Sequence, residues 1–120
     1  VIFPHLAREA VERGSELLTT ITNDGWYGRT SAPYQHFALA SMRAIEQGRY
    51  LVRAANTGIS GAVDPYGRVV AKSAIFEQTG VVVDVRFLQG RTIYSRIGDV
   101  AAYASAAVTV LALVTLRRRR

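Results

Sequence analysis

The sequence contains no cysteine, and this absence restricts the chemistry available to the chain. Disulfide bonds, cysteine-based metal sites and a cysteine nucleophile are all excluded within these 120 residues. The same absence leaves the redox compartment of the protein undetermined. Lysine is almost missing as well, since Lys72 is the single lysine of the chain.

The net charge of +6 is concentrated at one end of the chain. The four arginines at positions 117–120 supply four of these charges, so the preceding residues carry only about +2. The other basic residues are scattered and do not alternate with aromatic residues, as they do in surfaces that bind nucleic acid. We therefore predict no nucleic-acid partner.

The length of 120 residues allows at most one small domain. The first 98 residues can bury only a modest core, so a strand-rich unit of this size is marginally stable by itself. The sequence begins with Val1 and has no charged segment followed by an apolar leader. We expect the chain to be a fragment of a longer protein.

The first half of the chain predicts two helices separated by a buried strand. Pro4 suits the first turn of a helix over residues 5–13, which Gly14 ends, and the apolar residues 17–22 predict a strand. A second helix is expected from Ser31 or Ala32 to Gln47, ending at Gly48, with Pro33 in its first turn. This order is typical of a layered α/β fold.

The next forty residues predict four more strands. The first two, residues 50–55 and 59–63, are joined by Asn56-Thr57-Gly58. A turn at Asp64-Pro65-Tyr66-Gly67 then makes a hairpin with a third strand over residues 68–72. The valine-rich residues 80–87 predict a fourth strand that is apolar on both faces over most of its length. Together they indicate mixed sheets with helices outside.

The tail predicts a transmembrane helix. Residues 100–116 carry no charge and would reach about 25 Å as a helix, close to the ~30 Å hydrocarbon core of a bilayer. Small residues four apart, such as Ala102 and Ala106, allow close packing against other membrane helices. The positive-inside rule places residues 117–120 in the cytoplasm and residues 1–98 on the opposite side of the membrane. A buried helix of a soluble protein is the alternative.

The densest polar and aromatic stretch is Asn23-Asp24-Gly25-Trp26-Tyr27-Gly28, directly after the first predicted strand. Asn and Asp side chains bond nearby backbone amides, and glycine permits the chain to double back. The pattern fits either an ordinary turn or the wall of a pocket.

Short motifs follow this loop at residues 35–36, 42–49, 53–60 and 64–67. Together with residues 23–28, their order resembles the C-terminal half of a nitrilase-type, or carbon-nitrogen hydrolase, domain. The resemblance is closer to the membrane-embedded branch, the apolipoprotein N-acyltransferases, because of residues 92–99 and the apolar helix after them. It implies an α/β fold: the C-terminal part of an αββα sandwich, residues 1–98, then one transmembrane helix, residues 99–116, and a basic tail. The residues that carry the resemblance are 23–28, 35–36, 42–49, 53–60, 64–67 and 92–99.

The resemblance also implies a reaction. Enzymes of this branch use a Glu base, a Lys and a Cys nucleophile to move a phospholipid acyl chain, through a thioester, to the amine of a diacylglyceryl-lipoprotein. Lys72 does not match the catalytic lysine, so the resemblance places all three catalytic residues upstream of Val1. We therefore expect the chain alone to be inactive. No cofactor is expected, and the implied location is the bacterial inner membrane, with residues 1–98 on the periplasmic side.

The same resemblance assigns site residues within the chain. Asn23, Asp24, Trp26 and Tyr27 match the loop that lines the active site, although Trp26 also fits a core aromatic. Arg43 and Glu46 lie three residues apart and can pair, either as a structural pair or to position a loop beside the site.

Other kinds of active site find little support. Gly58-Ile59-Ser60-Gly61 does not match the Gly-x-Ser-x-Gly elbow of serine hydrolases. His5 and His36 have neither a Ser and an acid at recognisable spacing nor the partners of a metal site. Two other functions stay open: a fragment of a soluble nitrilase or amidase, and a non-catalytic, single-span interaction domain.

Overall fold

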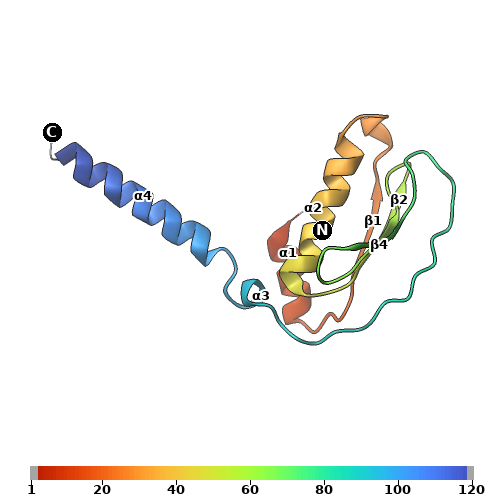
Figure 1. Cartoon of the computed structure of the whole chain (residues 1–120), viewed down its shortest axis with the longest axis horizontal. Coiled ribbons are helices and arrows are strands. Elements are labelled where there is room, and N and C mark those ends of the chain that lie inside the picture. Colours follow the sequence, from red (N-terminus) through yellow and green to blue (C-terminus); the bar gives the residue numbers. More distant parts are fainter. Residues whose placement is uncertain (1–2, 119–120) are drawn as a thin grey trace.

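The strands of this chain form one four-stranded sheet in the computed structural model, which describes residues 3–118 (Figure 1). β1 and β2 pair in parallel, whereas β2–β3 and β3–β4 are antiparallel. The strand order follows the sequence order, β1-β2-β3-β4. The strands are β1 Leu18–Asn23, β2 Leu51–Asn56, β3 Gly61–Val63 and β4 Val69–Lys72.

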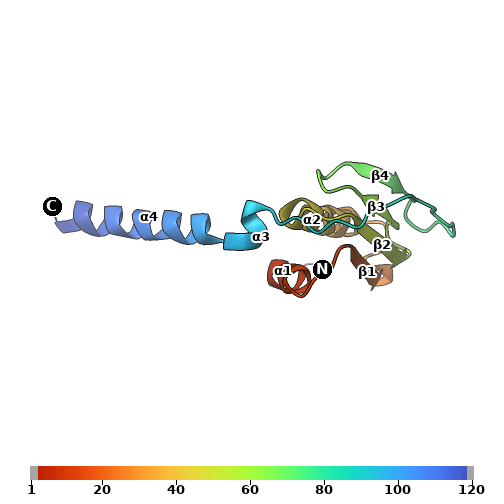
Figure 2. The same cartoon turned by 90° about the horizontal axis from the view of Figure 1, so that it is seen from below.

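Two helices cover one face of the sheet, as Figure 2 shows from below. α1, Pro4–Glu12, has Pro4 in its first turn and buries Ala7 and Val11. α2, Ala32–Gln47, connects the two parallel strands and ends at Gly48, whose φ of +62° is the left-handed conformation of a helix end. Both predicted helices are confirmed.

Small residues bring α2 close to the sheet. Ala40 and Ala44 are fully buried and join the core with Phe37 and the strand residues Leu51 and Val63. Alanine places little more than a backbone at the contact, so helix and sheet can approach closely. This position of α2 brings its first turns against the ends of β1 and β2.

The predicted hairpin turn is confirmed between β3 and β4. The Asp64 carbonyl accepts a hydrogen bond from the Gly67 amide at 3.0 Å, and the Asp64 side chain accepts from the Tyr66 and Arg68 amides at 2.8 and 2.9 Å. The strand predicted over residues 59–63 is shorter than expected. It corresponds to β3, which begins at Gly61, so Ile59 and Ser60 lie before it. Ser60 instead donates from its amide to the Ser73 hydroxyl at 3.0 Å.

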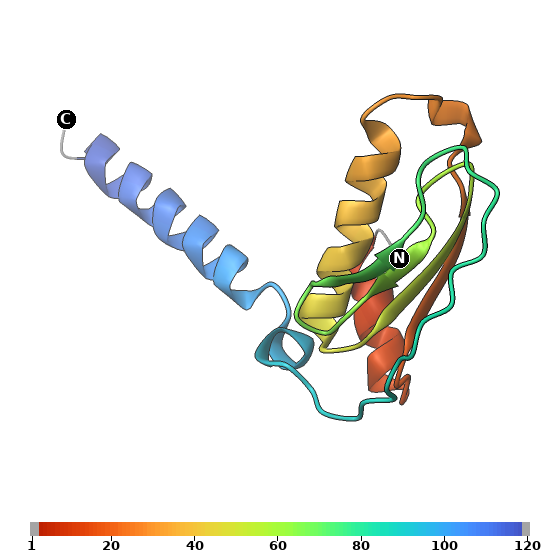
Figure 3. The same cartoon turned by 45° about the vertical axis from the view of Figure 1, so that its right-hand side comes forward.

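The predicted strand over residues 80–87 was wrong. These residues form no strand in the structure, and the segment runs outside the sheet as the teal trace of Figure 3. Val82 is 98% exposed, and one tie near the segment's end is the Leu88 amide donating to Glu16 O at 3.2 Å. Valine content marks a segment that favours extended backbone, but a strand also needs a neighbouring backbone to pair with.

Two helices end the described chain. α3, Ile93–Ile97, was not predicted; Thr92 caps it by accepting a hydrogen bond from the Ser95 amide at 2.9 Å. After Gly98, α4, Val100–Arg118, points away from the rest of the molecule (Figure 1). Residues 100–117 have a mean hydropathy of 1.7, and none of that stretch is buried. By length and composition this helix is able to cross a membrane.

Ion pairs connect α1 to the segment before α3. Glu12 accepts from Arg8 at 3.1 Å and from Arg91 at 3.0 Å. Hydrogen bonds from Arg8 and Arg91 lower the pKa of the Glu12 carboxyl. Arg8 also donates to the Arg96 carbonyl at 3.1 Å, so α1 contacts α3 directly.

Candidate active-site wall

The C-terminal ends of the two parallel strands place Asn23 and Asn56 side by side. Asn56 Nδ2 donates to Asn23 Oδ1 at 3.2 Å, and the Gly25 amide donates to the same oxygen at 2.9 Å. The Asp24 amide donates to the Asn56 carbonyl at 3.1 Å. In α/β folds, ligands bind outside the carboxyl ends of such strands. The asparagines therefore fix the base of a candidate site.

Asp24, which follows β1, is buried, with 1% of its surface exposed. Its Oδ2 accepts from Arg53 Nη2 at 2.7 Å, and its Oδ1 lies 2.8 Å from His36 Nδ1. The side chains of Asp24 and Arg53 are both 0% exposed, so their opposite charges balance in the interior. This buried cluster of Asp24, His36 and Arg53 joins the loop after β1 to α2 and β2.

A hydrogen bond from His36 to the Asp24 carboxylate requires a proton on His36 Nδ1, because the carboxylate accepts hydrogen bonds. Arg53 Nη2 lies 3.1 Å from the same Nδ1, but two donors cannot bond each other, so this is a packing contact. Arg53 Nε donates instead to the Ile59 carbonyl at 3.1 Å, and among the described residues its Nη1 has no hydrogen-bond partner.

Gly58 makes room for the buried carboxylate. A Cβ added at Gly58 would lie 2.2 Å from Asp24 Oδ2 and 2.9 Å from Asp24 Cβ. Every other residue type carries a Cβ, so only glycine fits at this position without moving Asp24.

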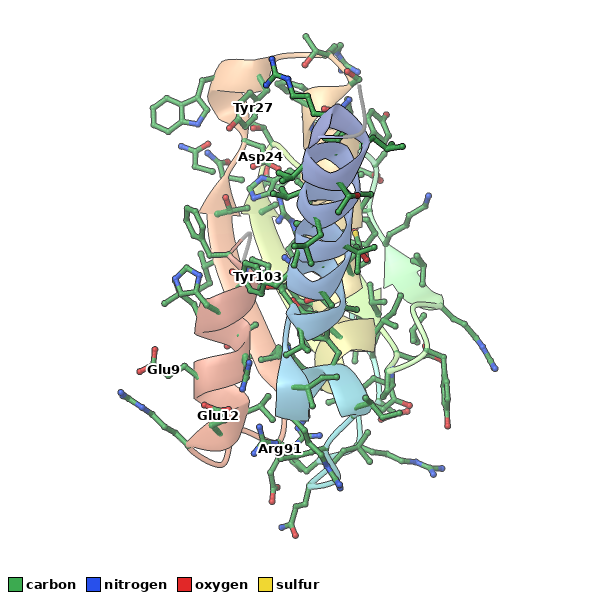
Figure 4. All side chains as sticks on the ribbon, turned by 90° about the vertical axis from the view of Figure 1, so that its left-hand side faces the viewer. Glu9, Glu12, Asp24, Tyr27, Arg91 and Tyr103 are labelled. Carbon is green, nitrogen blue, oxygen red and sulfur yellow. The ribbon has the colours of Figure 1, made fainter. Side chains whose placement is uncertain are left out.

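The Trp26 loop, residues 25–28, lies directly above this cluster. Gly25–Tyr27 forms a short 3₁₀ turn in which the Tyr27 amide donates to the Asp24 carbonyl at 3.1 Å, and Gly28 follows with a φ of +57°. Trp26 is 82% exposed and Tyr27 43%. Figure 4 shows Tyr27 and Asp24 at one end of the molecule and Glu12 and Arg91 at the other.

The structure thus brings Asn23, Asp24, Trp26 and Tyr27 together but places Arg43 and Glu46 elsewhere. Arg43 Nη2 donates to Glu46 Oε1 at 2.5 Å, in the last turns of α2. At 1.5 Å per residue, Arg43 lies about 17 Å and Glu46 about 21 Å along the helix from its first residue, Ala32, which is beside the Trp26 loop. The backbone carbonyl of Glu46 accepts from the Thr92 hydroxyl, so the last turn of α2 contacts the cap of α3.

His36 and Arg53 are functional candidates that sequence reasoning missed, although both stand in segments that it singled out. Arg53 carried a signal, since a charged residue in an otherwise apolar strand indicates a buried partner. His36 carried none, because its link to Asp24 depends on how α2 lies on the sheet. Within residues 3–118, no three His, Asp or Glu side chains gather as they would around a metal ion.

Arg49 is another buried residue without a predicted role. Its guanidinium donates to four backbone carbonyls, those of Ser15, Gln47, Gly48 and Gly90. Burial lowers the pKa of this guanidinium from its ordinary value. Arg49 therefore connects the start of β1, the end of α2 and the segment before α3.

A surface cavity of about 690 Å³ lies at the α3 end of the sheet, away from the Trp26 loop. Its walls include Tyr50, Tyr66, Leu88 and Arg91. None of the residues predicted for the site lines it.

The sequence of this chain is similar to those of known proteins. The family model of carbon-nitrogen hydrolases matches residues 1–92. Apolipoprotein N-acyltransferase of Geobacter metallireducens is 44% identical over 119 residues, which are 98% of this chain and 23% of that protein. The enzyme of Rhodopseudomonas palustris is 46% identical over 102 residues, 85% of this chain and 19% of that protein. The chain spans about a fifth of these relatives.

A solved structure agrees with this assignment. A C145A mutant of the Nesterenkonia amidase from the nitrilase superfamily superposes with a TM-score of 0.50 and 29% identity, covering 61% of this chain and 30% of the amidase. The mixed sheet with α1 and α2 on one face is thus a nitrilase-like α/β fold. The chain belongs to the carbon-nitrogen hydrolase family.

Proposed function

We propose that the chain is the C-terminal part of an apolipoprotein N-acyltransferase. The observation that carries this proposal is the extent of the match, since the identity with the Geobacter enzyme covers 98% of the chain, including the apolar helix α4. The family model of carbon-nitrogen hydrolases ends at residue 92, before that helix. Relatives that share both parts are named acyltransferases.

The proposed reaction has two steps. A thiolate of the whole enzyme attacks the ester carbonyl of a phospholipid, forms a thioester and releases the lysophospholipid, whose alkoxide takes a proton. The α-amine of a diacylglyceryl-lipoprotein then attacks the thioester, the amide forms, and the thiol regains a proton. This chain has no cysteine, so the thiol belongs to another part of that enzyme. We place the Glu base and the Lys there as well, because Lys72 does not match the catalytic lysine of the family, and the chain alone is inactive.

The contribution of this chain is a wall of the pocket. Trp26 and Tyr27 offer exposed aromatic surface to an acyl chain or to the amine acceptor, while Asn23 and Asp24 hold the backbone that carries them. The pair of Arg43 and Glu46 supports the fold at the other end of α2.

The proposed location is the bacterial inner membrane. α4 crosses the bilayer and packs against other membrane helices of the enzyme, with residues 1–98 on the periplasmic side. The four arginines at 117–120 then lie in the cytoplasm, as the positive-inside rule favours.

A second candidate is part of a soluble amidase, which the likeness to the Nesterenkonia amidase favours. The exposed apolar helix α4 argues against it, since water would solvate seventeen uncharged residues poorly. A non-catalytic single-span protein would keep α4 but would not need the Trp26 loop.

A segment exchange tests the proposal. The 119 matching residues of the Geobacter enzyme are replaced by this chain, and the chimera is expressed in bacteria depleted of their own N-acyltransferase. Mass spectrometry of lipoprotein N-termini then counts acyl chains, and we expect a third chain to appear. The matched control carries the same segment from the Rhodopseudomonas enzyme. An active control beside an inactive chimera would refute the proposal.

A further inference from the structure

The Trp26 loop is held by hydrogen bonds of Asp24 and not by contacts of the Trp26 ring. Trp26 is 82% exposed, so its ring makes few contacts within the described chain. The loop instead follows Asp24, whose carbonyl accepts from the Tyr27 amide and whose amide donates to the Asn56 carbonyl. The orientation of Asp24 therefore determines where the loop presents its Trp.

We propose that His36 is a positioning residue of the proposed acyltransferase site. It acts through the hydrogen bond that its Nδ1–H donates to Asp24, next to the Trp26 loop. The inference rests on the proposed function for its consequence in catalysis. Its structural part, that His36 fixes the loop, stands on the geometry of this chain alone.

The geometry favours this role over simple stabilisation. Arg53 already balances the charge of Asp24 through Oδ2 at 2.7 Å. What His36 adds is a bond to the other carboxylate oxygen, Oδ1, at 2.8 Å, which sets the plane of the carboxylate. Without it, the one remaining partner of Oδ1 among residues 3–118 is the Thr22 hydroxyl, at a weak 3.4 Å.

The cluster also connects the three elements that meet at the site. His36 stands in the second turn of α2, Arg53 in the middle of β2, and Asp24 directly after β1. The side chain of His36 is 14% exposed, so its ring lies at the boundary between the core and the site. A shift of α2 or β2 relative to β1 would therefore move Asp24, and with it the Trp26 loop.

Two polar substitutions distinguish the effect of the hydrogen bond from His36 Nδ1 to Asp24 from the effect of losing the imidazole ring. The amide nitrogen of Asn reaches the place of Nδ1, so His36→Asn keeps the donor to Asp24. The amide nitrogen of Gln reaches the place of Nε2, so His36→Gln loses that donor. In the chimera we expect His36→Asn to retain acyl transfer within about threefold and His36→Gln to lose about tenfold to a hundredfold, the effect of misplacing a site by about 1 Å.

A double variant shows whether the loss passes through the loop. Combined with Trp26→Ala, His36→Gln should cost little beyond Trp26→Ala alone, because both changes remove the same positioned side chain. Losses that simply multiply would overturn the proposal, as would a His36→Asn chimera as slow as His36→Gln, or a His36→Gln chimera as fast as the parent.

A measurement that does not depend on catalysis distinguishes the proposed acyltransferase function from the proposed role of His36. Trp26 is the single tryptophan of the 120-residue chain, so its fluorescence anisotropy in detergent micelles reports the loop directly. We expect anisotropy to fall in His36→Gln and to stay unchanged in His36→Asn. Should His36→Gln fail to fold by circular dichroism, the smaller His36→Ser takes its place. An inactive chimera with this anisotropy pattern would refute the acyltransferase function alone, and equal anisotropy in all variants would refute the role of His36.

Discussion

Gly58→Ala is the sharpest test of the packing around Asp24. The added Cβ would lie 2.2 Å from Asp24 Oδ2, where ordinary contact begins at 3.4 Å, so the carboxylate must move by about 1.2 Å. Rotation of the side chain does not relieve the clash, because Asp24 Cβ is itself only 2.9 Å away. The backbone of the loop must therefore shift as well.

The expected cost follows from the ion pair that this movement breaks. Asp24 and Arg53 are 0% exposed, and the 2.7 Å contact between them would lengthen toward 4 Å. Separating a fully buried pair costs about 3–5 kcal/mol, and partial relaxation leads us to expect about 3 kcal/mol in the free energy of unfolding. Since about 1.4 kcal/mol is a factor of ten, the population of open molecules should rise about a hundredfold.

Hydrogen exchange of β2 amides measures this change in the 120-residue chain in detergent micelles. Gly80→Ala is the matched control, because a Cβ at Gly80 meets nothing within 4 Å. We expect β2 protection to drop about a hundredfold in Gly58→Ala and to change little in Gly80→Ala. Equal protection in both proteins would show that Asp24 is not confined as the structure describes, and the reasoning would fail.

Three further predictions concern the site, the α1–α3 contact and the tail. Trp26→Ala in the chimera should leave the protein folded but slow thioester formation or acyl transfer at least tenfold; unchanged rates would remove Trp26 from the pocket. The lowered pKa of Glu12 means that its ion pairs with Arg8 and Arg91 are present at neutral pH and are lost on acidification, as pH falls through that lowered pKa. Amide exchange in α3, corrected for its intrinsic pH dependence, should therefore rise on acidification, and Glu12→Gln should show the raised value already at pH 7. Finally, Leu111→Arg near the middle of α4 should cost about 2.5–3.5 kcal/mol in membrane insertion and release the chain on carbonate extraction, whereas Thr115→Arg near the arginine tail should not.

The elements that local chemistry specifies were predictable from the sequence. Gly48 ends α2 because its φ of +62° suits glycine, and Asp64 closes the hairpin through bonds to amides two and four residues ahead. These signals act within one turn of chain, so the printed sequence contains them. The apolar run before the arginines is of the same kind, since its length and composition suffice to predict the helix α4.

The features that depend on distant partners were not predictable in this way. Residues 80–87 have the composition of a strand, but pairing requires a second backbone that composition cannot supply. Asp24 and Arg53 are 29 residues apart and meet because β1 and β2 pair in parallel with Asn23 opposite Asn56. The loop was predicted as a site, while the cluster that supports it emerged only from the packing of α2. The assignment of its residues to a substrate pocket stays a prediction.

The exposed apolar surface indicates how the wall is used. α1 and α2 cover one face of the sheet, and on the other face Ile21 of β1 is 90% exposed, a few residues before the exposed Trp26. A second sheet packed here, as in an αββα sandwich, would bury Ile21 and leave Trp26 at the rim, where β1 ends. The cluster of Asp24, His36 and Arg53, next to the Trp26 loop in space, would then hold Trp26 where the two layers meet.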